Sequence, residues 1–293
     1  MRTGFIGLGN MGGPMAANLA AGGHTVSGFD TAGVDIEGVT RVDDVAAAVE
    51  GMDVVITMLP DGRVLRSVYD EIVPRGTPGA LFLDCSTVDT DSAMAAHRQA
   101  AAAGLLSIDA PVSGGVGGAK AGTLTFMAGG TPEAFERATP VLDIMGARVV
   151  HCGDGGAGQA AKICNNMLLG ISMIGTCEAF ALGEKLGLAP ERLFEVLSIS
   201  SGSCWSVNTY CPVPGVGPES PADNAYTPGF AAELMLKDLR LSQGAAKGVD
   251  ANTPLGHAAA ALYARFVDGD GAGKDFSAML PLLAASAREQ ADD

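Results

Sequence analysis

The 293-residue sequence is poor in aromatic residues, which make up 5% of it, and in basic residues, and it contains a single Trp. Its 18 Lys and Arg stand against 33 Asp and Glu, giving a formal net charge of −15. This balance argues against a surface that binds nucleic acid or an anionic membrane. The sequence has no Gly-X-Y repeat, which excludes collagen, and its 47% hydrophobic content excludes a disordered chain.

Segments that would span a membrane, direct export or hold a metal are also lacking. The longest weakly polar run without a charge, Ile163–Cys177, is shorter than the ~20 residues that cross a bilayer, so it predicts a buried core helix. The first residues, MRTGFIGLGNMGG, lack the pattern of a secretory signal, and we expect a cytoplasmic protein. The six cysteines form no C-x-x-C pair, which predicts free thiols and no metal site.

What is present in the first half is an alternation of short apolar runs and helix-like segments. Buried strands are predicted over Gly4–Leu8, Thr25–Phe29, Val54–Leu59, Leu81–Asp84 and Leu105–Asp109. Helices are predicted over Met11–Ala21, Val42–Val49, Arg63–Ile72 and Asp91–Ala103. Further strands are expected over Thr123–Ala128 and Arg148–His151, on either side of a helix that Thr131 caps. This alternation predicts a parallel sheet covered by helices.

The second half is helical. From Gln159 to Leu186 there is neither proline nor strand-like alternation, which predicts one long helix that ends at Gly187. Further helices are expected over Pro190–Ser198, Ala231–Lys247 and Pro254–Phe266, with a loop over Ser200–Pro228. We therefore predict an α/β domain over residues 1–158 and a mainly helical domain over residues 159–293.

A glycine-rich turn near the N-terminus predicts a dinucleotide site. Gly7, Gly9 and Gly12 form Gly-x-Gly-x-x-Gly between a predicted strand and a predicted helix, with Asn10 and Met11 inside the pattern. The glycines permit a tight turn and let a pyrophosphate approach the backbone. Asp30, at the end of the next strand, is placed to bind a ribose 2′-hydroxyl and to repel a 2′-phosphate. NAD is therefore favoured over NADP.

Two further segments carry candidate chemistry. Ser113, Gly114 and Gly115 follow a predicted parallel strand, where ligands bind, and their hydroxyl and amides suit a carboxylate; an ordinary turn is the alternative. Lys162 begins the long helix, and Asn166 lies one turn further on the same face. A lysine there is suited to take a hydroxyl proton as hydride leaves carbon, although a surface lysine is the alternative.

A third candidate is the charged pair Lys237-Asp238, for which an exposed pair on a helix is the alternative. The four histidines are scattered and show no metal-binding or Ser/His/Asp pattern, so no catalytic role is assigned to them.

Taken in order along the chain, the motifs resemble those of the β-hydroxyacid dehydrogenases. The matching segments are GFIGLGNMGGPMAANL, DCST (84–87), DAPVSGG (109–115), AGTL (121–124), GAGQAAKICNNMLL (156–169) and GFAAELMLKDLRL (229–241). Within the family, Asp30, the CWSVNTYCPVPGV loop (204–216) and the late DFS (275–277) favour the members that act on 3-hydroxyisobutyrate.

The resemblance implies an α/β Rossmann domain with a parallel sheet, joined by a long helix to an all-α C-terminal domain that forms a homodimer or homotetramer. It also implies NAD-dependent oxidation of (S)-3-hydroxyisobutyrate to methylmalonate semialdehyde, a step of valine catabolism. It implies that Lys162 is the catalytic acid and base. The residues implied to bind substrate are Ser113, Gly114, Gly115, Asn166 and Asp238. Those implied to line the cofactor, besides the glycine-rich turn and Asp30, are Leu59, Pro60, Thr87, Phe230 and Lys237.

Three alternatives remain open on the sequence. A neighbouring enzyme, such as tartronate semialdehyde reductase or another short semialdehyde reductase, would use the same residues. A non-catalytic dinucleotide-binding module would not need Lys162 with Asn166. An imine reductase of related architecture would generally lack the lysine.

Overall fold

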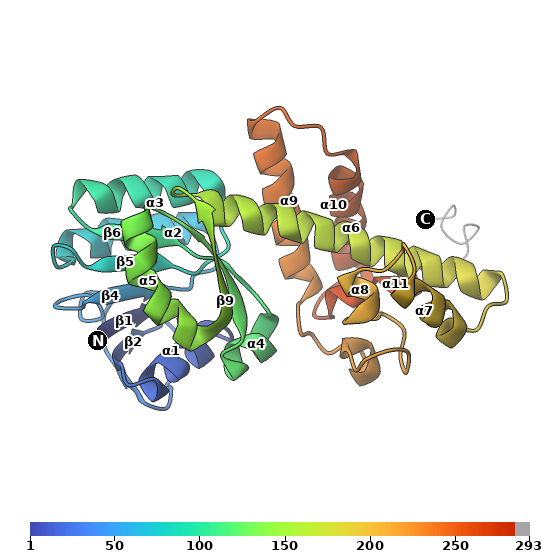
Figure 1. Ribbon diagram of the computed structural model, residues 1–293, viewed down its shortest axis with the longest axis horizontal. Coiled ribbons are helices and arrows are strands. Elements are labelled where there is room, and N and C mark those ends of the chain that lie inside the picture. The colour runs from blue at the N-terminus through green and yellow to red at the C-terminus, as the bar shows by residue number, and fades with distance from the viewer. Residues whose placement is uncertain (285–293) are drawn as a thin grey trace. The chain divides into compact units, whose positions relative to one another are not determined.

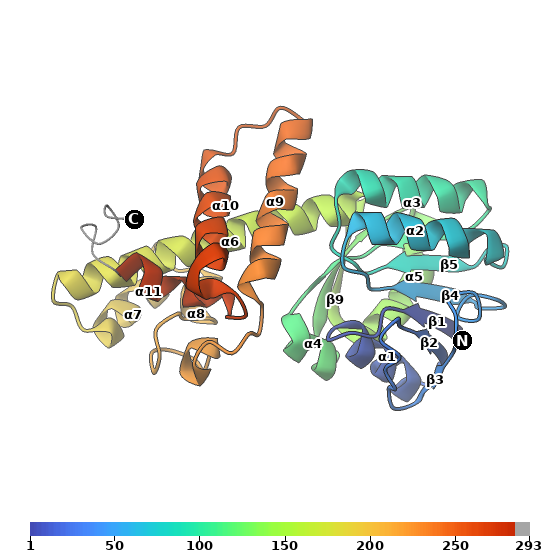
Figure 2. The ribbon, with the colours of Figure 1, turned by 180° about the vertical axis from the view of Figure 1, so that it is seen from behind.

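The computed structural model describes residues 1–284, and it divides into two compact units at Lys162 (Figures 1 and 2). The first unit comprises residues 1–162, and the second begins at Ile163. Residues 285–293 of the predicted helical domain lie outside the described part of the chain.

The first unit is built on one sheet. Its strands are β1 (Arg2–Ile6), β2 (Thr25–Phe29), β3 (Val39–Arg41), β4 (Val54–Thr57), β5 (Leu81–Asp84), β6 (Leu106–Asp109), β7 (Val112–Ser113), β8 (Leu124–Gly129) and β9 (Gly146–Gly153). They lie in the order β3-β2-β1-β4-β5-β6-β8-β7, with β9 beside β8. Strands β1 to β6 pair in parallel, whereas β8 is antiparallel to β6 and β7. The sheet is therefore mostly parallel.

Helices cover both faces of this sheet, as strands apolar on both faces require. The helices of this unit are α1 (Gly12–Ala21), α2 (Gly62–Ile72), α3 (Thr90–Ala102), α4 (Gly115–Ala121) and α5 (Pro132–Met145). Phe5 and Phe126 pack in one core with side chains of α1 and α5, whereas Phe82 packs in a second core with those of α2 and α3. Thr131 caps α5 as predicted, accepting a hydrogen bond from the Ala134 amide.

The helix predicted over Val42–Val49 is wrong, because this segment forms successive turns. Asp44 accepts a hydrogen bond from the Ala47 amide, and the Val49 amide bonds to Ala46 O, a tight local pattern in place of a continuous helix. Val45 and Val49 are nevertheless buried, which explains why their spacing resembled that of a helix. Strands β3 and β7 and helix α4 were not predicted.

The second unit is helical. Its helices are the part of α6 (Ala157–Lys185) from Ile163 onward, α7 (Pro190–Ile199), α8 (Trp205–Asn208), α9 (Ala232–Gly248), α10 (Pro254–Phe266) and α11 (Met279–Ala284). Helices α9 and α10 lie side by side, and Met235 and Tyr263 from them pack against Met173 of α6 (Figure 2). Gly187 ends the long helix with a φ of +80°, as predicted.

Helix α6 is, among the described residues, long and apolar enough to cross a membrane by length and composition alone. Half of the apolar window is buried inside the protein, and Met173 and Cys177 are fully buried. The core helix of a soluble protein has the same composition, and this is how we interpret α6. All six cysteines are free thiols, and no cluster suited to a metal ion occurs in the described part of the chain.

Candidate active site

The predicted cofactor residues of the first unit follow the carboxyl ends of neighbouring parallel strands. The glycine-rich turn follows β1, Asp30 follows β2, Leu59 and Pro60 follow β4, and Thr87 follows β5. The Ser113 loop follows β6. Parallel pairing brings these segments to one edge of the sheet, where open α/β folds bind their ligands.

The glycine-rich turn has the geometry that a pyrophosphate needs. Gly7 adopts a φ of +94°, which favours glycine, and its amide bonds to the Phe29 carbonyl of β2. A Cβ placed on Gly9 would meet no atom within 4 Å, so the space in front of this residue is open. Asn10 and Met11 lead directly into α1, whose first residue is Gly12. The open space and the start of the helix fit an anionic cofactor.

Asp30 lies against this turn. Its Oδ2 accepts a hydrogen bond of 2.7 Å from the Leu8 amide, and its Oδ1 accepts one of 2.8 Å from the Ala32 amide. Because a carboxylate oxygen accepts more than one hydrogen bond, the half-buried Asp30 retains the capacity to bind ribose hydroxyls. Its negative charge disfavours the extra phosphate of NADP, so the residues fit NAD.

Hydrogen bonds connect the turns after β4 and β5. The Leu59 amide donates to Ser86 Oγ over 2.8 Å, and this hydroxyl donates to Asp84 Oδ1 over 2.6 Å. Pro60 and Thr87 adjoin these two residues in the chain. The two cofactor-lining segments are thereby held in a fixed relation.

The carboxylate loop turns sharply after β7. Ser113 pairs with Thr125 of β8, and Gly114 and Gly115 follow it with φ angles of +131° and +61°. Two consecutive residues with positive φ favour glycine, and glycine has no side chain that would cover the backbone. The absence of side chains at Gly114 and Gly115 lets a ligand approach the backbone beside Ser113.

Lys162 and Asn166 lie one turn apart on α6, which places their side chains on the same face of the helix. Lys162 is 7% exposed and Asn166 is 1% exposed. The alternative of a surface lysine at position 162 is therefore wrong.

Asn166 belongs to a polar cluster of the second unit. Its Nδ2 donates to Oδ2 of Asp238, and its Oδ1 accepts from Asn165 over 2.9 Å. Lys237 Nζ lies 3.8 Å from Oδ1 of Asp238, which is itself buried. The alternative of an exposed pair is therefore wrong for Asp238, whose carboxylate links the Lys237 ammonium to the Asn166 amide.

Phe230 is fixed at the start of α9. Its amide donates to Oδ2 of the fully buried Asp275 over 2.9 Å, and its ring packs edge-on against Phe276, with the ring centroids 5.6 Å apart. The DFS segment is a point of resemblance in the sequence, but no role was predicted for Asp275. No role was predicted either for Gln159 and Asp109, although the Gln159 amide donates a hydrogen bond to Oδ2 of Asp109 at the start of α6.

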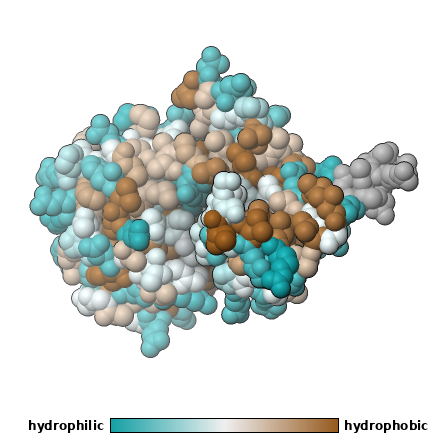
Figure 3. Space-filling model, turned by 45° about the vertical axis from the view of Figure 1, so that its right-hand side comes forward, coloured by the Kyte–Doolittle hydropathy of each residue, from teal (hydrophilic) through white to brown (hydrophobic). Residues whose placement is uncertain are grey.

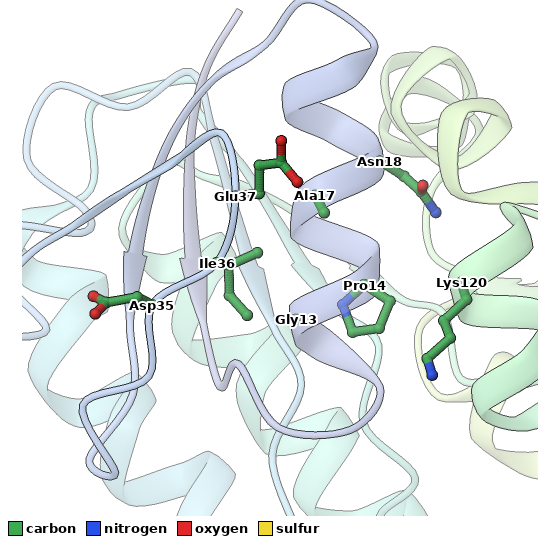
Figure 4. A pocket seen from close by; sticks show the side chains of 8 residues that line it. All are labelled: Gly13, Pro14, Ala17, Asn18, Asp35, Ile36, Glu37 and Lys120. Carbon is green, nitrogen blue, oxygen red and sulfur yellow. The ribbon is translucent and has the colours of Figure 1, made fainter.

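A hollow on the first unit begins at Gly13, directly after the glycine-rich turn (Figure 4). It is bordered by α1, α4 and the segment 35–37, and Lys120, Asp35 and Glu37 lie at its rim. None of the predicted site residues lines it. Its two carboxylates disfavour the phosphates of a dinucleotide.

Both parts of the chain match known families. Residues 2–153 match the NAD binding domain of 6-phosphogluconate dehydrogenase, and residues 156–283 match the "NAD-binding of NADP-dependent 3-hydroxyisobutyrate dehydrogenase" domain. The chain is 50% identical to a 3-hydroxyisobutyrate dehydrogenase of Pseudomonas aeruginosa, over 95% of this chain and 97% of that protein. It is 45% identical to an NAD-dependent L-serine dehydrogenase of the same organism, over 95% and 96%.

A solved structure of Mycobacterium tuberculosis 3-hydroxyisobutyrate dehydrogenase with L-serine superimposes with a TM-score of 0.93 and 48% identity. It covers 97% of this chain and 100% of that chain. The sheet, its glycine-rich turn and the helical second unit define an NAD-binding dehydrogenase. The chain belongs to the 3-hydroxyisobutyrate dehydrogenase family.

Proposed function

We propose that the protein oxidises 3-hydroxyisobutyrate to methylmalonate semialdehyde, with Lys162 as the general base and, in the reverse direction, the general acid. The observation that carries the lysine's role is a buried Lys162 one helical turn before the buried Asn166. NAD, when held by the glycine-rich turn and Asp30, would supply the acceptor for the hydride that leaves the hydroxyl-bearing carbon. Lys162 Nζ takes the hydroxyl proton in the same conversion, so that a C=O bond replaces the C–H and O–H bonds.

The remaining predicted residues orient the substrate. Ser113 and the amides of Gly114 and Gly115 would hold the carboxylate, because an anion is bound well by several converging donors. Asn166 would bind the reacting oxygen, and Asp238 fixes its amide by accepting a hydrogen bond from Nδ2. Phe230 and Lys237 would lie against the cofactor. The first unit would thus supply the glycine-rich turn, the carboxylate loop and Lys162, and the second would supply the remaining substrate and cofactor residues and the oligomer contacts.

Replacing Lys162 tests the mechanism. Lys162→Ala is expected to lower kcat about 100- to 10,000-fold, because a positioned acid–base group contributes that much, with a smaller change in KM. The rates are followed by NADH absorbance. Lys120→Ala, which removes an exposed lysine of the same unit, is the matched control and is expected to keep kcat within about twofold. A Lys162→Ala enzyme with near wild-type turnover contradicts the proposal and favours a non-catalytic role for this lysine.

The substrate is tested by a screen. We expect the highest kcat/KM for 3-hydroxyisobutyrate with NAD, against 3-hydroxypropionate, L-serine and glycerate, each with NAD and with NADP. L-serine is the second candidate, because one relative is named for its oxidation and another was solved with it. A preference for glycerate contradicts the substrate assignment, and a preference for NADP contradicts the role of Asp30.

We further propose a cytoplasmic homodimer or homotetramer. Most large hydrophobic side chains that are exposed among the described residues belong to the second unit, where brown areas gather in Figure 3. Leu168, Leu182 and Leu186 follow one face of α6 and its end, and Ile199 ends α7. Exposed apolar side chains that recur along one helix face favour an interface, and a second copy of the chain is the occupant we propose. The six free thiols support a reducing compartment.

A further inference from the structure

The start of helix α6 is held by several buried hydrogen bonds, all within the first unit. The segment Gly153–Gln159 leads from β9 into this helix, which carries Lys162 one turn later. The first amides of a helix have no partner within the helix itself and must find one elsewhere. Here they find it in a carboxylate that is far away in the sequence.

That carboxylate belongs to Asp109, the last residue of β6. Its Oδ1 accepts from the Gly156 amide over 2.7 Å, and its Oδ2 accepts from the Gln159 amide over 2.8 Å. His97 Nε2, from α3, lies 2.8 Å from the same Oδ1. Asp109 is 1% exposed. Asp109 therefore fixes the helix start to the sheet strand that leads into the Ser113 loop.

The Gln159 side chain makes a second, independent attachment. Its Nε2 donates to the Ser86 carbonyl over 2.7 Å, and its Oε1 accepts from the Val88 amide over 3.1 Å. Gln159 is fully buried. The two partners flank Thr87, so Gln159 connects the helix to the segment predicted to line the cofactor.

Close packing at Gly158 also holds this helix start against the sheet. A Cβ on Gly158 would lie 2.2 Å from the Met127 carbonyl of β8 and 2.5 Å from that of Asp109, so no other residue fits there. The helix backbone therefore touches two strands of the sheet directly. Loss of a contact of Gln159 or Asp109 would therefore displace the helical turn that carries Lys162.

We infer that Gln159 and Asp109 are positioning residues that set the place of the Lys162 amine relative to the cofactor-lining segment at Thr87. This inference rests on the proposed role of Lys162. General acid–base catalysis depends on placement, and a displacement near 1 Å lowers a rate about 100-fold. Neither residue exchanges a proton with the substrate.

A double-mutant cycle tests this inference. Gln159→Met keeps the length of the side chain and removes both of its hydrogen bonds. We expect it to lower kcat about 10- to 100-fold in the wild-type background, with KM changed less than about threefold. In a Lys162→Ala background assayed with added ethylamine, the same change should lower the rate less than about threefold, because a diffusing amine is not attached to the helix.

Controls separate positioning from general damage. Thr3→Val removes a buried hydroxyl and its hydrogen bond to His24 in the same unit, and it should leave kcat within about twofold. Melting temperatures and NADH binding report folding. If Gln159→Met does not fold, Asp109→Asn, which retains one acceptor, replaces it in the cycle.

Equal losses from Gln159→Met in the two backgrounds overturn the inference, as does an unchanged kcat in the wild-type background. Near wild-type turnover of Lys162→Ala alone overturns instead the proposed role of the lysine. The two failures are therefore distinguished by the single variants.

Discussion

Asp84 and Asp109 are the same residue type, are paired in register on neighbouring strands and have opposite environments. Asp109 is surrounded by amide donors and His97, which suit a charged carboxylate. Asp84 accepts hydrogen bonds from Thr57 and Ser86 on Oδ1, but its Oδ2 has no partner among the described residues. Burial raises the pKa of Asp84 from 3.8 to about 6. The folded protein therefore stabilises the protonated form of the Asp84 carboxyl.

The Asp84 pKa predicts how stability depends on pH. The folded state holds the proton of this carboxyl more tightly than the unfolded state, so its contribution to the unfolding free energy is largest below pH 3.8. That contribution declines as pH rises from 3.8 to about 6 and is constant above. The pKa difference corresponds to about 3 kcal/mol. Urea unfolding of wild type and Asp84→Asn between pH 4 and pH 7 measures it.

The stability of wild type relative to Asp84→Asn is expected to fall by up to about 3 kcal/mol across that range. The comparison between the two proteins removes the contributions of all other carboxyl groups. A difference that stays constant with pH contradicts the assignment.

At the scale of elements, one carboxylate joins three segments of the second unit. Asp275 Oδ2 accepts from the Tyr210 hydroxyl and from the amides of Gly229 and Phe230, and its Oδ1 accepts from the amide and hydroxyl of Ser277. The loop before α9, the loop after α8 and the DFS segment therefore converge on a fully buried side chain.

Asp275→Asn is expected to destabilise the protein by about 2–4 kcal/mol. The substitution replaces one of the two accepting oxygens by an NH2 group, which cannot accept the hydrogen bonds that this oxygen accepts in the wild type. It should also raise KM, since Phe230 begins the segment that leads to Lys237 and Asp238. Thermal unfolding and steady-state kinetics measure the two effects. Asp53→Asn, which alters an exposed pair with Arg2, is the matched control and should move Tm by no more than ~2 °C. Equal shifts in both variants would refute the role given to Asp275.

The elements that could be predicted from the sequence are those defined by local patterns. Strand β2, strand β5 and helix α10 have the predicted limits, because local apolar patterns and the turns beside them define these elements. Gly7, Gly9 and Gly12 are recognisable for the same reason, since their function depends on adjacent residues. The short edge strands and the turns at Val42–Val49 depend on distant partners. Gln159 binds Ser86 and Asp275 binds Tyr210, residues 73 and 65 positions away, so no local pattern reveals them.

At the scale of the whole molecule, we expect a mass at least twice the 29.5 kDa of one chain in light scattering after gel filtration. Leu182→Glu with Leu186→Glu is expected to shift the protein to the monomer, because two charges would enter the proposed apolar contact of α6. These side chains are 61% and 70% exposed, so the fold should tolerate the change. Val34→Glu, on the first unit, is the control. A monomeric wild-type protein contradicts the proposed assembly.

The continuity of α6 has a consequence for recombination between relatives. Residues 157–162 of this helix belong to the first unit and residues 163–185 to the second. A hybrid enzyme joined within the glycine-rich segment 153–156 would take Gln159 and Lys162 from one parent and Asp109 and Ser86 from the other. A join after Lys162 keeps these four residues from a single parent. The crossover point best tolerated in a chimera therefore lies inside a helix, whereas exchanges between domains are ordinarily placed in loops.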